Sequence, residues 1–378
     1  MFKIAVLGAG EQAQGVAYYL NHDPRVKEFV CYDNDDMRLY AIRKYLGSKG
    51  HIFLLDADDP DILLRVLQEG KYHGVFNALP YRLLPKTTQT IIMAGLPGVD
   101  LGQATGEQEY LRDAAEQIDV SYARGCGMAP GIISDVGFAG IKELDKCFSV
   151  RMYCGGILQN PRGKLGHASF FSVPGLYYEY AATPYYIFGG KKVKGEPLMP
   201  GNSQTFVLHN DKKIINTEAA VTAEAFEPDI ELWEEVSDTV SYATLRHTEF
   251  SHFTKVRKAL ATKNEEEFID WLWRNLIPKE GERDMMVWRV YVVGEKAGVK
   301  TTIIYESICM YNEQVCLSAM QQYTAFPATE TLLQILSHPQ SWPAGFPYHE
   351  RHINMALLKT NLLRHGLVIK KTIIPDLS

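Results

Sequence analysis

An apolar run that leads directly into a glycine turn, near the start of the chain, constrains the fold more than any other feature. Residues 3–13 read Lys-Ile-Ala-Val-Leu-Gly-Ala-Gly-Glu-Gln-Ala. Consecutive apolar residues predict a parallel strand buried on both faces, and Gly8 allows a turn without a Cβ clash. Gly10 leaves room for phosphates, and Ala13 fills the small third position of a G-x-G-x-x-G/A motif at the start of a helix. The stretch predicts a strand, turn and helix that bind a dinucleotide.

The acid expected of such a unit follows the second predicted strand. Residues 28–32 are mostly apolar and end at Asp33, 25 residues after Gly8. A carboxylate there accepts both ribose hydroxyls of NAD and repels the 2′-phosphate of NADP, so NAD is favoured, although Arg38 leaves NADP open. The alternative is a β-α-β unit that binds nothing, with Asp33 as the N-cap of the next helix.

Strands and helices alternate through the first 125 residues in units of about 20–30 residues, which is typical of a doubly wound parallel sheet. The fold class expected is therefore α/β, with an N-terminal Rossmann domain. Further strands are predicted over residues 51–55, 74–81, 98–101 and 120–123, and helices over 12–20, 37–46, 60–67, 87–94, 107–117 and 133–144.

The carboxyl ends of the predicted parallel strands define the expected cofactor residues, because these ends meet at one edge of a sheet. The predicted strand 51–55 is expected to end where the adenine would lie, and the predicted strand 74–81 where the nicotinamide would lie. The glycine-rich loop 125–132 is expected on the cofactor side of the sheet. The cofactor residues expected are Gly8, Gly10, Glu11, Gln12, Asp33, Asp56, Ala57, Asn77, Ala78, Leu79, Pro80, Met128 and Pro130.

From residue 148 the pattern changes to long strands with polar alternation, which indicates a second α+β domain with a mostly antiparallel sheet. Residues 1–125 are expected to form the Rossmann domain, completed by 325–378, and residues 126–324 the domain for substrate binding and dimerisation. Strands are expected at 148–154, 205–208, 219–224, 285–294, 300–310 and 367–372, and helices at 250–260, 265–276, 314–323, 328–336 and 353–363.

Charge and cysteine usage exclude several classes of function. A net charge of −6 with interleaved signs is inconsistent with nucleic-acid or anionic-membrane binding. The start of the chain resembles a core strand and not a leader, and no apolar run reaches the ~18 residues that cross a bilayer, so we expect a cytoplasmic protein. The six cysteines form no C-x-x-C pair and the histidines lack zinc-site spacing, so we expect reduced thiols and no metal.

Motifs beyond the glycine turn resemble the saccharopine dehydrogenase-like family, which contains saccharopine reductase, lysine 6-dehydrogenase and carboxynorspermidine dehydrogenase. The resemblance implies a pyridine-nucleotide oxidoreductase that acts on a C–N bond of an amino acid, as a homodimer or higher homo-oligomer. The matching stretches are residues 127–132 (Gly-Met-Ala-Pro-Gly-Ile), 153–157 (Tyr-Cys-Gly-Gly-Ile), 171–180, 242–246 (Tyr-Ala-Thr-Leu-Arg) and Asp284.

Two departures bear on the substrate. Ala129 stands where saccharopine reductase has an Asp before Pro-Gly, and Leu158 replaces the proline of a Gly-Gly-Leu-Pro motif. The resemblance is therefore closer to L-lysine 6-dehydrogenase, which deaminates its substrate through an imine. Saccharopine or carboxynorspermidine reductase is the alternative enzyme, and a non-catalytic nucleotide-sensing protein is the alternative of another class.

Amine oxidation requires a hydride acceptor and a base, for which the candidates are Asp100, Tyr81 and Cys154. Asp100 has the strongest physical case, because a carboxylate at a strand end binds an ammonium group and its pKa rises on partial burial. Each candidate also has a structural interpretation: a cap or turn residue for Asp100, a packed ring for Tyr81 and a small buried hydrophobe for Cys154.

The substrate carboxylate is expected to bind Arg246, whose planar guanidinium donates two parallel hydrogen bonds. Tyr81, Cys154 and Arg246 resemble substrate-site positions of saccharopine reductase, and Gly155, Gly156 and Tyr178 are expected to bind substrate beside them. The alternative for Arg246 is an exposed ion pair with Glu249.

Overall fold

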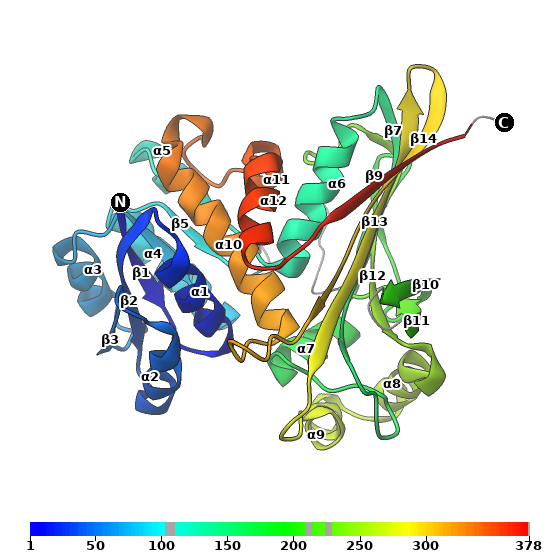
Figure 1. Ribbon diagram of the computed structural model, residues 1–378, viewed down its shortest axis with the longest axis horizontal. Coiled ribbons are helices and arrows are strands. Elements are labelled where there is room, and N and C mark those ends of the chain that lie inside the picture. Colours follow the sequence, from blue (N-terminus) through cyan, green and yellow to red (C-terminus); the bar gives the residue numbers. More distant parts are fainter. Residues whose placement is uncertain (103–109, 209–212, 224–228, 377–378) are drawn as a thin grey trace. The chain divides into compact units, whose positions relative to one another are not determined.

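A computed structural model describes residues 1–102, 110–208, 213–223 and 229–376. The chain forms two compact units: unit 1 comprises Met1–Asp135 and Gln321–His365, and unit 2 comprises Val136–Met320 and Gly366–Ser378. Each unit contains one large sheet, parallel in unit 1 and mostly antiparallel in unit 2 (Figure 1). The predicted fold class, a Rossmann-type sheet with a second α+β part, is confirmed.

The sheet of unit 1 has six parallel strands in the order β3-β2-β1-β4-β5-β6. This is the order of a Rossmann fold, in which the direction of winding reverses between β1 and β4. Residues 4–7 of β1 are fully buried, as a parallel strand covered on both faces requires. The strands are β1 Phe2–Leu7, β2 Val26–Asp33, β3 Gly50–Leu54, β4 Gly74–Asn77, β5 Gly98–Asp100 and β6 Tyr122–Ala123.

Several helices of unit 1 begin at a residue whose side chain caps them. Asp59 accepts hydrogen bonds from the peptide N–H groups of Asp61 and Ile62 at the start of α3. Residues 107–109 of the predicted helix 107–117 lie outside the described residues. The helices are α1 Glu11–His22, α2 Asp36–Ile42, α3 Pro60–Glu69, α4 Leu84–Met93, α5 Tyr110–Gln117, α11 His349–His352 and α12 Met355–Arg364, with α6 Ile133–Ile141 and α10 Ala319–Ser337 shared with unit 2.

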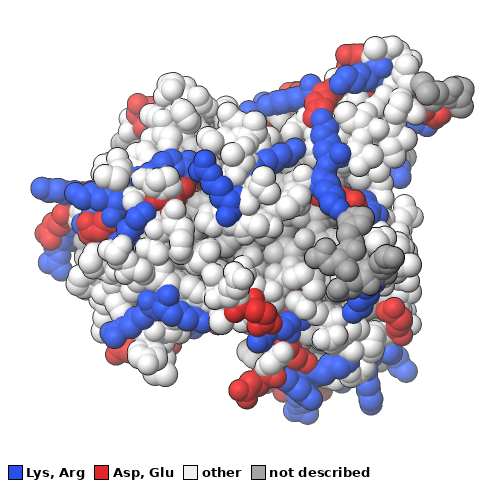
Figure 2. Space-filling view, in the orientation of Figure 1, with Lys and Arg blue, Asp and Glu red and all other residues white. Residues whose placement is uncertain are grey.

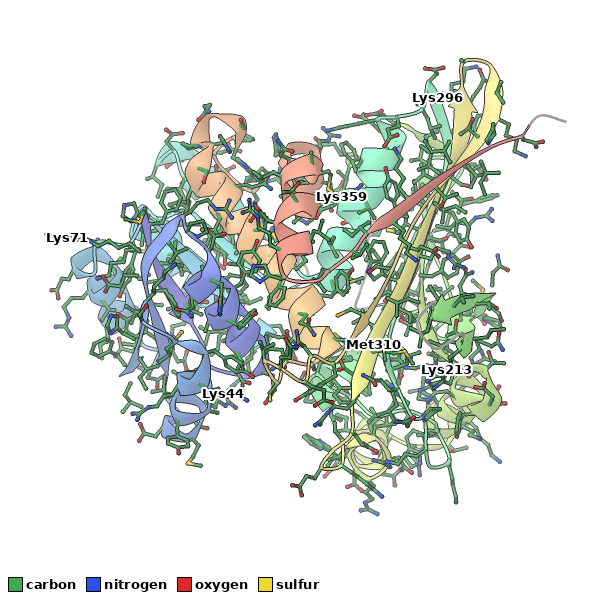
Figure 3. All side chains as sticks on the ribbon, viewed as in Figure 1. Lys44, Lys71, Lys213, Lys296, Met310 and Lys359 are labelled. Atoms are coloured by element: carbon green, nitrogen blue, oxygen red, sulfur yellow. The ribbon has the colours of Figure 1, made fainter. Side chains whose placement is uncertain are left out.

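The sheet of unit 2 has nine strands, with β10-β11-β12-β7-β13-β14-β15 as its main path, β8 paired with β12, and β9 paired with β8. All its pairings are antiparallel except β12 with β7. The β13–β14 hairpin turns through Ala297 and Gly298, which both have positive φ, next to Lys296, labelled in Figure 3. The elements are β7 Lys146–Leu158, α7 Val173–Ala181, β8 Tyr185–Phe188, β9 Lys191–Lys194, β10 Pro200–Leu208, β11 Lys213–Ala220, β12 Val236–His247, α8 His252–Thr262, α9 Glu265–Leu276, β13 Asp284–Lys296, β14 Val299–Met310 and β15 Lys370–Pro375.

The structure corrects three sequence predictions. The last strand was expected in the Rossmann domain, but β15 pairs with β14, so residues 366–378 belong to unit 2. The helices predicted at 314–323 and 328–336 form one helix, α10, which contains Pro327. The predicted strand 219–224 ends earlier, since β11 stops at Ala220, and Glu224 lies outside the described residues.

On the face shown in Figure 2, Lys and Arg side chains are interspersed with Asp and Glu, so charge is mixed on this face. Five of the six cysteine thiols are buried, and the sixth, Cys316, is exposed.

Among the described helices, none combines the length and hydropathy of a membrane span.

Glu330 joins the C-terminal helices to the start of the chain within unit 1. Its fully buried carboxylate accepts hydrogen bonds from Tyr19 of α1 (2.9 Å) and Asn361 of α12 (2.9 Å) and forms an ion pair with Arg25 (2.5 Å). Arg25 also contacts Asp23, so the cluster carries two carboxylates and one guanidinium. A buried ion pair is costly to break, because the remaining partner stays desolvated.

We therefore predict that Glu330→Gln lowers the free energy of unfolding by about 3–5 kcal/mol. Glu28→Gln removes the part-exposed pair with Lys3 and serves as the matched control, with a loss below ~1 kcal/mol. Urea denaturation of both variants measures the difference. Equal losses in the two variants would contradict the assignment of Glu330 as the central contact of these helices.

Candidate functional site

The glycine turn of unit 1 lies at the point where the winding of the sheet reverses. Gly8 ends β1 with φ +95°, and a Cβ atom there would lie 3.0 Å from the carbonyl oxygen of Ala78, just after β4. The N–H of Ala78 donates to the carbonyl of Leu7 (2.8 Å). The two chain segments therefore approach closely at the position where open α/β sheets bind ligands.

Gly10 has the features of a phosphate cradle. No atom lies within 4 Å of the position that a Cβ would occupy, so the space beside the backbone is open. Gly10 is the N-cap of α1 and supplies no side chain to the free N–H groups of this 12-residue helix. The neighbouring Gln12 Oε1 is buried and has no hydrogen-bond partner among the described residues. These features fit the binding of a pyrophosphate.

Asp33 ties the end of β2 to the glycine turn. Its carboxylate is 5% exposed and accepts hydrogen bonds from the N–H groups of Ala9 (2.7 Å) and Asp35 (3.0 Å). The N-cap of α2 is Asp35, so the expectation that Asp33 caps this helix is wrong. Arg38 lies 4.0 Å from Asp33 and 3.5 Å from Asp35.

The other expected cofactor residues differ in their surroundings. Asn77 is fully buried, and its amide donates to the hydroxyls of Thr87 (2.9 Å) and Tyr122 (3.4 Å), which fixes the exit of β4. Ala57 and Met128 are buried, Ala78, Leu79 and Pro130 are half-buried, and Glu11, Asp56 and Pro80 are exposed.

Asp100 is a buried carboxylate at the end of β5, where its register partner on β4 is Asn77. Its Oδ1 accepts hydrogen bonds from the N–H groups of Gly125 (2.9 Å) and Gly102 (3.1 Å), while its buried Oδ2 has no partner among the described residues. Burial raises the pKa of Asp100 to about 6, against the lowering effect of these bonds and of Arg124. Tyr81 follows β4 and is 55% exposed.

A histidine that the sequence analysis did not select contacts the first turn of α6, directly after the loop 125–132. Gly131 has φ +130°, and Ala129 and Pro130 are extended. His349 of α11 binds Asp135 through Nδ1 (2.7 Å) and lies 3.5 Å from Glu350, whose carboxylate accepts from Ser134 (2.7 Å). Against the effect of burial, the charges of Glu350 and Asp135 raise the pKa of His349 to about 9.

Arg246 of β12 is part of a buried polar cluster in unit 2. The side chain is 3% exposed and donates to the Tyr180 hydroxyl (3.1 Å), the Leu245 carbonyl (2.8 Å) and the Glu179 carboxylate (3.3 Å). The alternative of an exposed pair with Glu249 is wrong, because the guanidinium is buried and its counter-charge is Glu179. No local pattern in the sequence pairs residue 179 with residue 246, because the contact joins a helix and a strand far apart in the chain.

The hydrogen bonds around Arg246 have a definite direction. His252 Nδ1 lies 3.1 Å from the Leu165 carbonyl and therefore donates, which leaves Nε2 to accept from the Tyr180 hydroxyl (2.9 Å). The Tyr180 oxygen then accepts from Arg246 Nε. Burial lowers the pKa of His252 to about 3, consistent with this neutral tautomer.

Helix α7 supplies Glu179 and Tyr180 to the cluster. It begins at Ser172, whose hydroxyl accepts from the N–H of Gly175, and Pro174 lies in its first turn. Burial raises the pKa of Glu179, while Arg246 opposes the shift. Tyr178, on the same helix, is exposed and its ring contacts Tyr177.

Strand β7 supplies the other residues expected to bind substrate. The buried thiol of Cys154 lies 3.6 Å from the sulfur of Met286, and burial raises its pKa to about 12. A Cβ at Gly155 would lie 2.5 Å from the Leu245 carbonyl oxygen, and one at Gly156 would lie 2.6 Å from the Met320 methyl group. Close packing alone therefore requires glycine at residue 155.

Comparison with solved structures shows the fold of the chain. Saccharopine dehydrogenase (L-Glu forming) from Saccharomyces cerevisiae is similar over 99% of this chain and 100% of its own, with a TM-score of 0.76 at 16% identity. Homospermidine synthase from Legionella pneumophila, solved in complex with NAD, is similar over 99% of this chain and 91% of its own, with a TM-score of 0.67 at 12% identity. No protein-family model matches the chain. The resemblance found in the sequence is confirmed at the level of the saccharopine dehydrogenase-like fold.

The His349 cluster generates a prediction about pH. The pKa of His349 is about 9 in the folded protein, above its ordinary value of 6.5. Protonated His349 therefore stabilises the folded state fully below pH 6.5, and this stabilisation is lost as the pH rises through about 9. At ~1.4 kcal/mol per pKa unit the loss is on the order of 3 kcal/mol. Urea midpoints from pH 6 to 10 test the prediction. His349→Gln should flatten the dependence of stability on pH in this range, whereas His51→Gln, at an exposed histidine, should not. Parallel profiles for the parent protein and both variants would refute the prediction.

Proposed function

We propose that the protein is an NAD-dependent oxidoreductase that acts on a C–N bond of an amino acid, most like L-lysine 6-dehydrogenase. The observation that carries the proposal is the open glycine turn at the reversal of the sheet, joined through Asp33 to the end of β2, in a chain with the saccharopine dehydrogenase-like fold over its whole length. The two solved structures support it, because one is a dehydrogenase and the other was solved with NAD.

The residues of unit 1 fit a dinucleotide. The open backbone at Gly10 and the uncapped start of α1 would hold the pyrophosphate, and Asp33 would accept the ribose hydroxyls. Asp56 and Ala57 would lie by the adenine, and the segment after β4 by the nicotinamide. The bound cofactor would supply the acceptor for a hydride from the carbon that carries the amine.

Asp100 is the candidate base. A carboxylate with a pKa of about 6 is mostly ionised at neutral pH, and its unpartnered Oδ2 can take a proton from the substrate ammonium. The nitrogen lone pair released in this way drives loss of the hydride and formation of a C=N bond. Water then adds to that carbon, and cleavage of the C–N bond releases ammonia. The thiol of Cys154, with a pKa of about 12, is a weaker candidate.

The sequence analysis leaves two alternatives. The yeast enzyme with the similar fold acts on saccharopine, so a reductase that forms a secondary amine is the second candidate. The alternative of another class is an NAD(P)-sensing protein without catalysis. Assays of lysine, ornithine, saccharopine and carboxynorspermidine with NAD or NADP, and of the reverse reactions, distinguish them. Reduction of NAD by lysine supports the first proposal, and binding of NAD without turnover of any amine favours the sensor.

The cofactor preference depends on Asp33. Asp33→Ala should narrow the difference between the binding free energies of NAD and NADP by ~1–3 kcal/mol, the size of a lost charged hydrogen bond. Calorimetric titration of both cofactors measures it, with exposed Asp36→Ala as the matched control. Equal affinities for NAD and NADP in the parent protein would refute selection by this carboxylate.

The substrate assignment depends on Arg246. Arg246→Lys cannot reproduce the planar hydrogen bonds, so we expect kcat/KM to fall by about 30- to 1000-fold, or ~2–4 kcal/mol, with NAD affinity nearly unchanged. Arg283→Lys, at a half-buried arginine paired with Glu313, is the control, and urea midpoints separate misfolding from lost binding. A change within a factor of about three would show that Arg246 only supports the fold.

A further inference from the structure

The first turn of α1 carries an acid next to the proposed pyrophosphate site. Glu11 is the first residue of the helix and directly follows Gly10, its N-cap, which has no side chain to bond the free N–H groups. These N–H groups attract a carboxylate in the first turn, and they attract a pyrophosphate in the same way. The carboxylate of Glu11 is therefore a competitor of the cofactor at this helix end.

Gln321 of α10 holds the competing carboxylate. Its side-chain amide nitrogen lies 3.1 Å from Glu11 Oε2 and donates a hydrogen bond of 2.8 Å to the main-chain carbonyl of the same residue. The same nitrogen lies 3.4 Å from Gln14 Oε1, further along α1. The Gln321 side chain is buried and that of Glu11 is exposed, so a fixed side chain restrains one that faces solvent.

The position of Gln321 follows from the close packing of α10 on α1 (Figure 1). A Cβ at Gly15 would lie 2.7 Å from the Cβ of Ala325 and 3.0 Å from the main-chain oxygen of Gln321. A side chain at residue 15 would therefore separate the two helices. All these residues belong to unit 1, and glycine at residue 15 brings the amide of Gln321 within reach of the first turn of α1.

We propose that Gln321 is a positioning residue for the dinucleotide, which acts by keeping the Glu11 carboxylate out of the pyrophosphate site. This inference rests on the proposed function and changes the role of Glu11 within it, because the side chain repels the cofactor instead of binding it. An amide donor is neutral, so the carboxylate keeps its charge, and the strength of the repulsion depends on where Gln321 holds it.

The charge of Glu11 gives a first test that leaves Gln321 unchanged. Glu11→Gln keeps an acceptor oxygen for the amide of Gln321 and removes the negative charge. We expect it to bind NAD about threefold more tightly than the parent protein at low ionic strength, and the gain to vanish near about 0.5 M salt, which screens exposed charges. Glu69→Gln, at an exposed acid in the last turn of α3, is the charge-matched control. An equal or weaker affinity of Glu11→Gln overturns the proposal.

Gln321→Leu tests the positioning directly. Leucine has no donor, so the carboxylate of Glu11 is released to the free N–H groups of α1, and we expect NAD to bind about three- to tenfold more weakly. The double variant Gln321→Leu/Glu11→Gln should recover the affinity of Glu11→Gln, because no charge remains to be released. An unchanged affinity in Gln321→Leu overturns the proposal. A loss that persists in the double variant also overturns it, because Gln321 then only packs the helices.

Gln334→Leu is the matched control for the loss of a buried amide on α10. The side chain of Gln334 is also buried and bonds to Glu330 and to the main chain of Asn354. We expect this variant to lower the urea midpoint and to leave the affinity for NAD unchanged. If Gln321→Leu does not fold, the comparison of Glu11→Gln with the parent protein decides, since Glu11 is exposed.

The outcomes for this inference and for the proposed function are distinct. All affinities are measured by calorimetric titration into the full chain with NAD, or with NADP if the parent protein binds it more tightly. Failure of the parent protein to bind either dinucleotide refutes the proposed function and this inference together. Binding of NAD with equal affinity by the parent protein and Glu11→Gln refutes this inference alone.

Discussion

A parallel sheet exposes two apolar faces, and the need to cover both organises unit 1. The first 135 residues do this only in part, and residues 321–365 return to complete it. Helix α10 approaches α1 so closely that a Cβ at Gly15 would lie 2.7 Å from that of Ala325. The carboxylate of Glu330 on α10 stabilises this contact, because it accepts hydrogen bonds from Tyr19 and Asn361 and forms an ion pair with Arg25. The glycine turn is therefore held in a unit built from both ends of the chain.

Local sequence patterns were sufficient for most of this architecture. The apolar run before Gly8 and the acid at Asp33 predicted β1, α1 and β2, because period and turn chemistry are local properties. The partner of the last strand was not predictable in this way. Residues 370–375 have a strand pattern, but only the pairing with β14 decides their unit, and pairing between distant strands leaves no local signal.

In the candidate sites too, residues close together in the sequence were predictable and contacts between distant residues were not. Gly8, Gly10 and Asp33 belong to one short stretch and were identified together, whereas the side-chain partners of Arg246 come from a helix far away in sequence. The sequence predicted the arginine but not its counter-charge, and Glu249 was the nearest acid in the chain. His252 and His349 were not selected, because a histidine acquires its role from surroundings that only the fold supplies.

Amide hydrogen exchange with and without NAD shows whether NAD binds at the reversal of the sheet in unit 1. We expect slower exchange in residues 8–13 and in the segments after β2 and β4, with no change in β13 and β14 of unit 2. An unchanged rate in residues 8–13 at saturating NAD, or protection confined to unit 2, would contradict it.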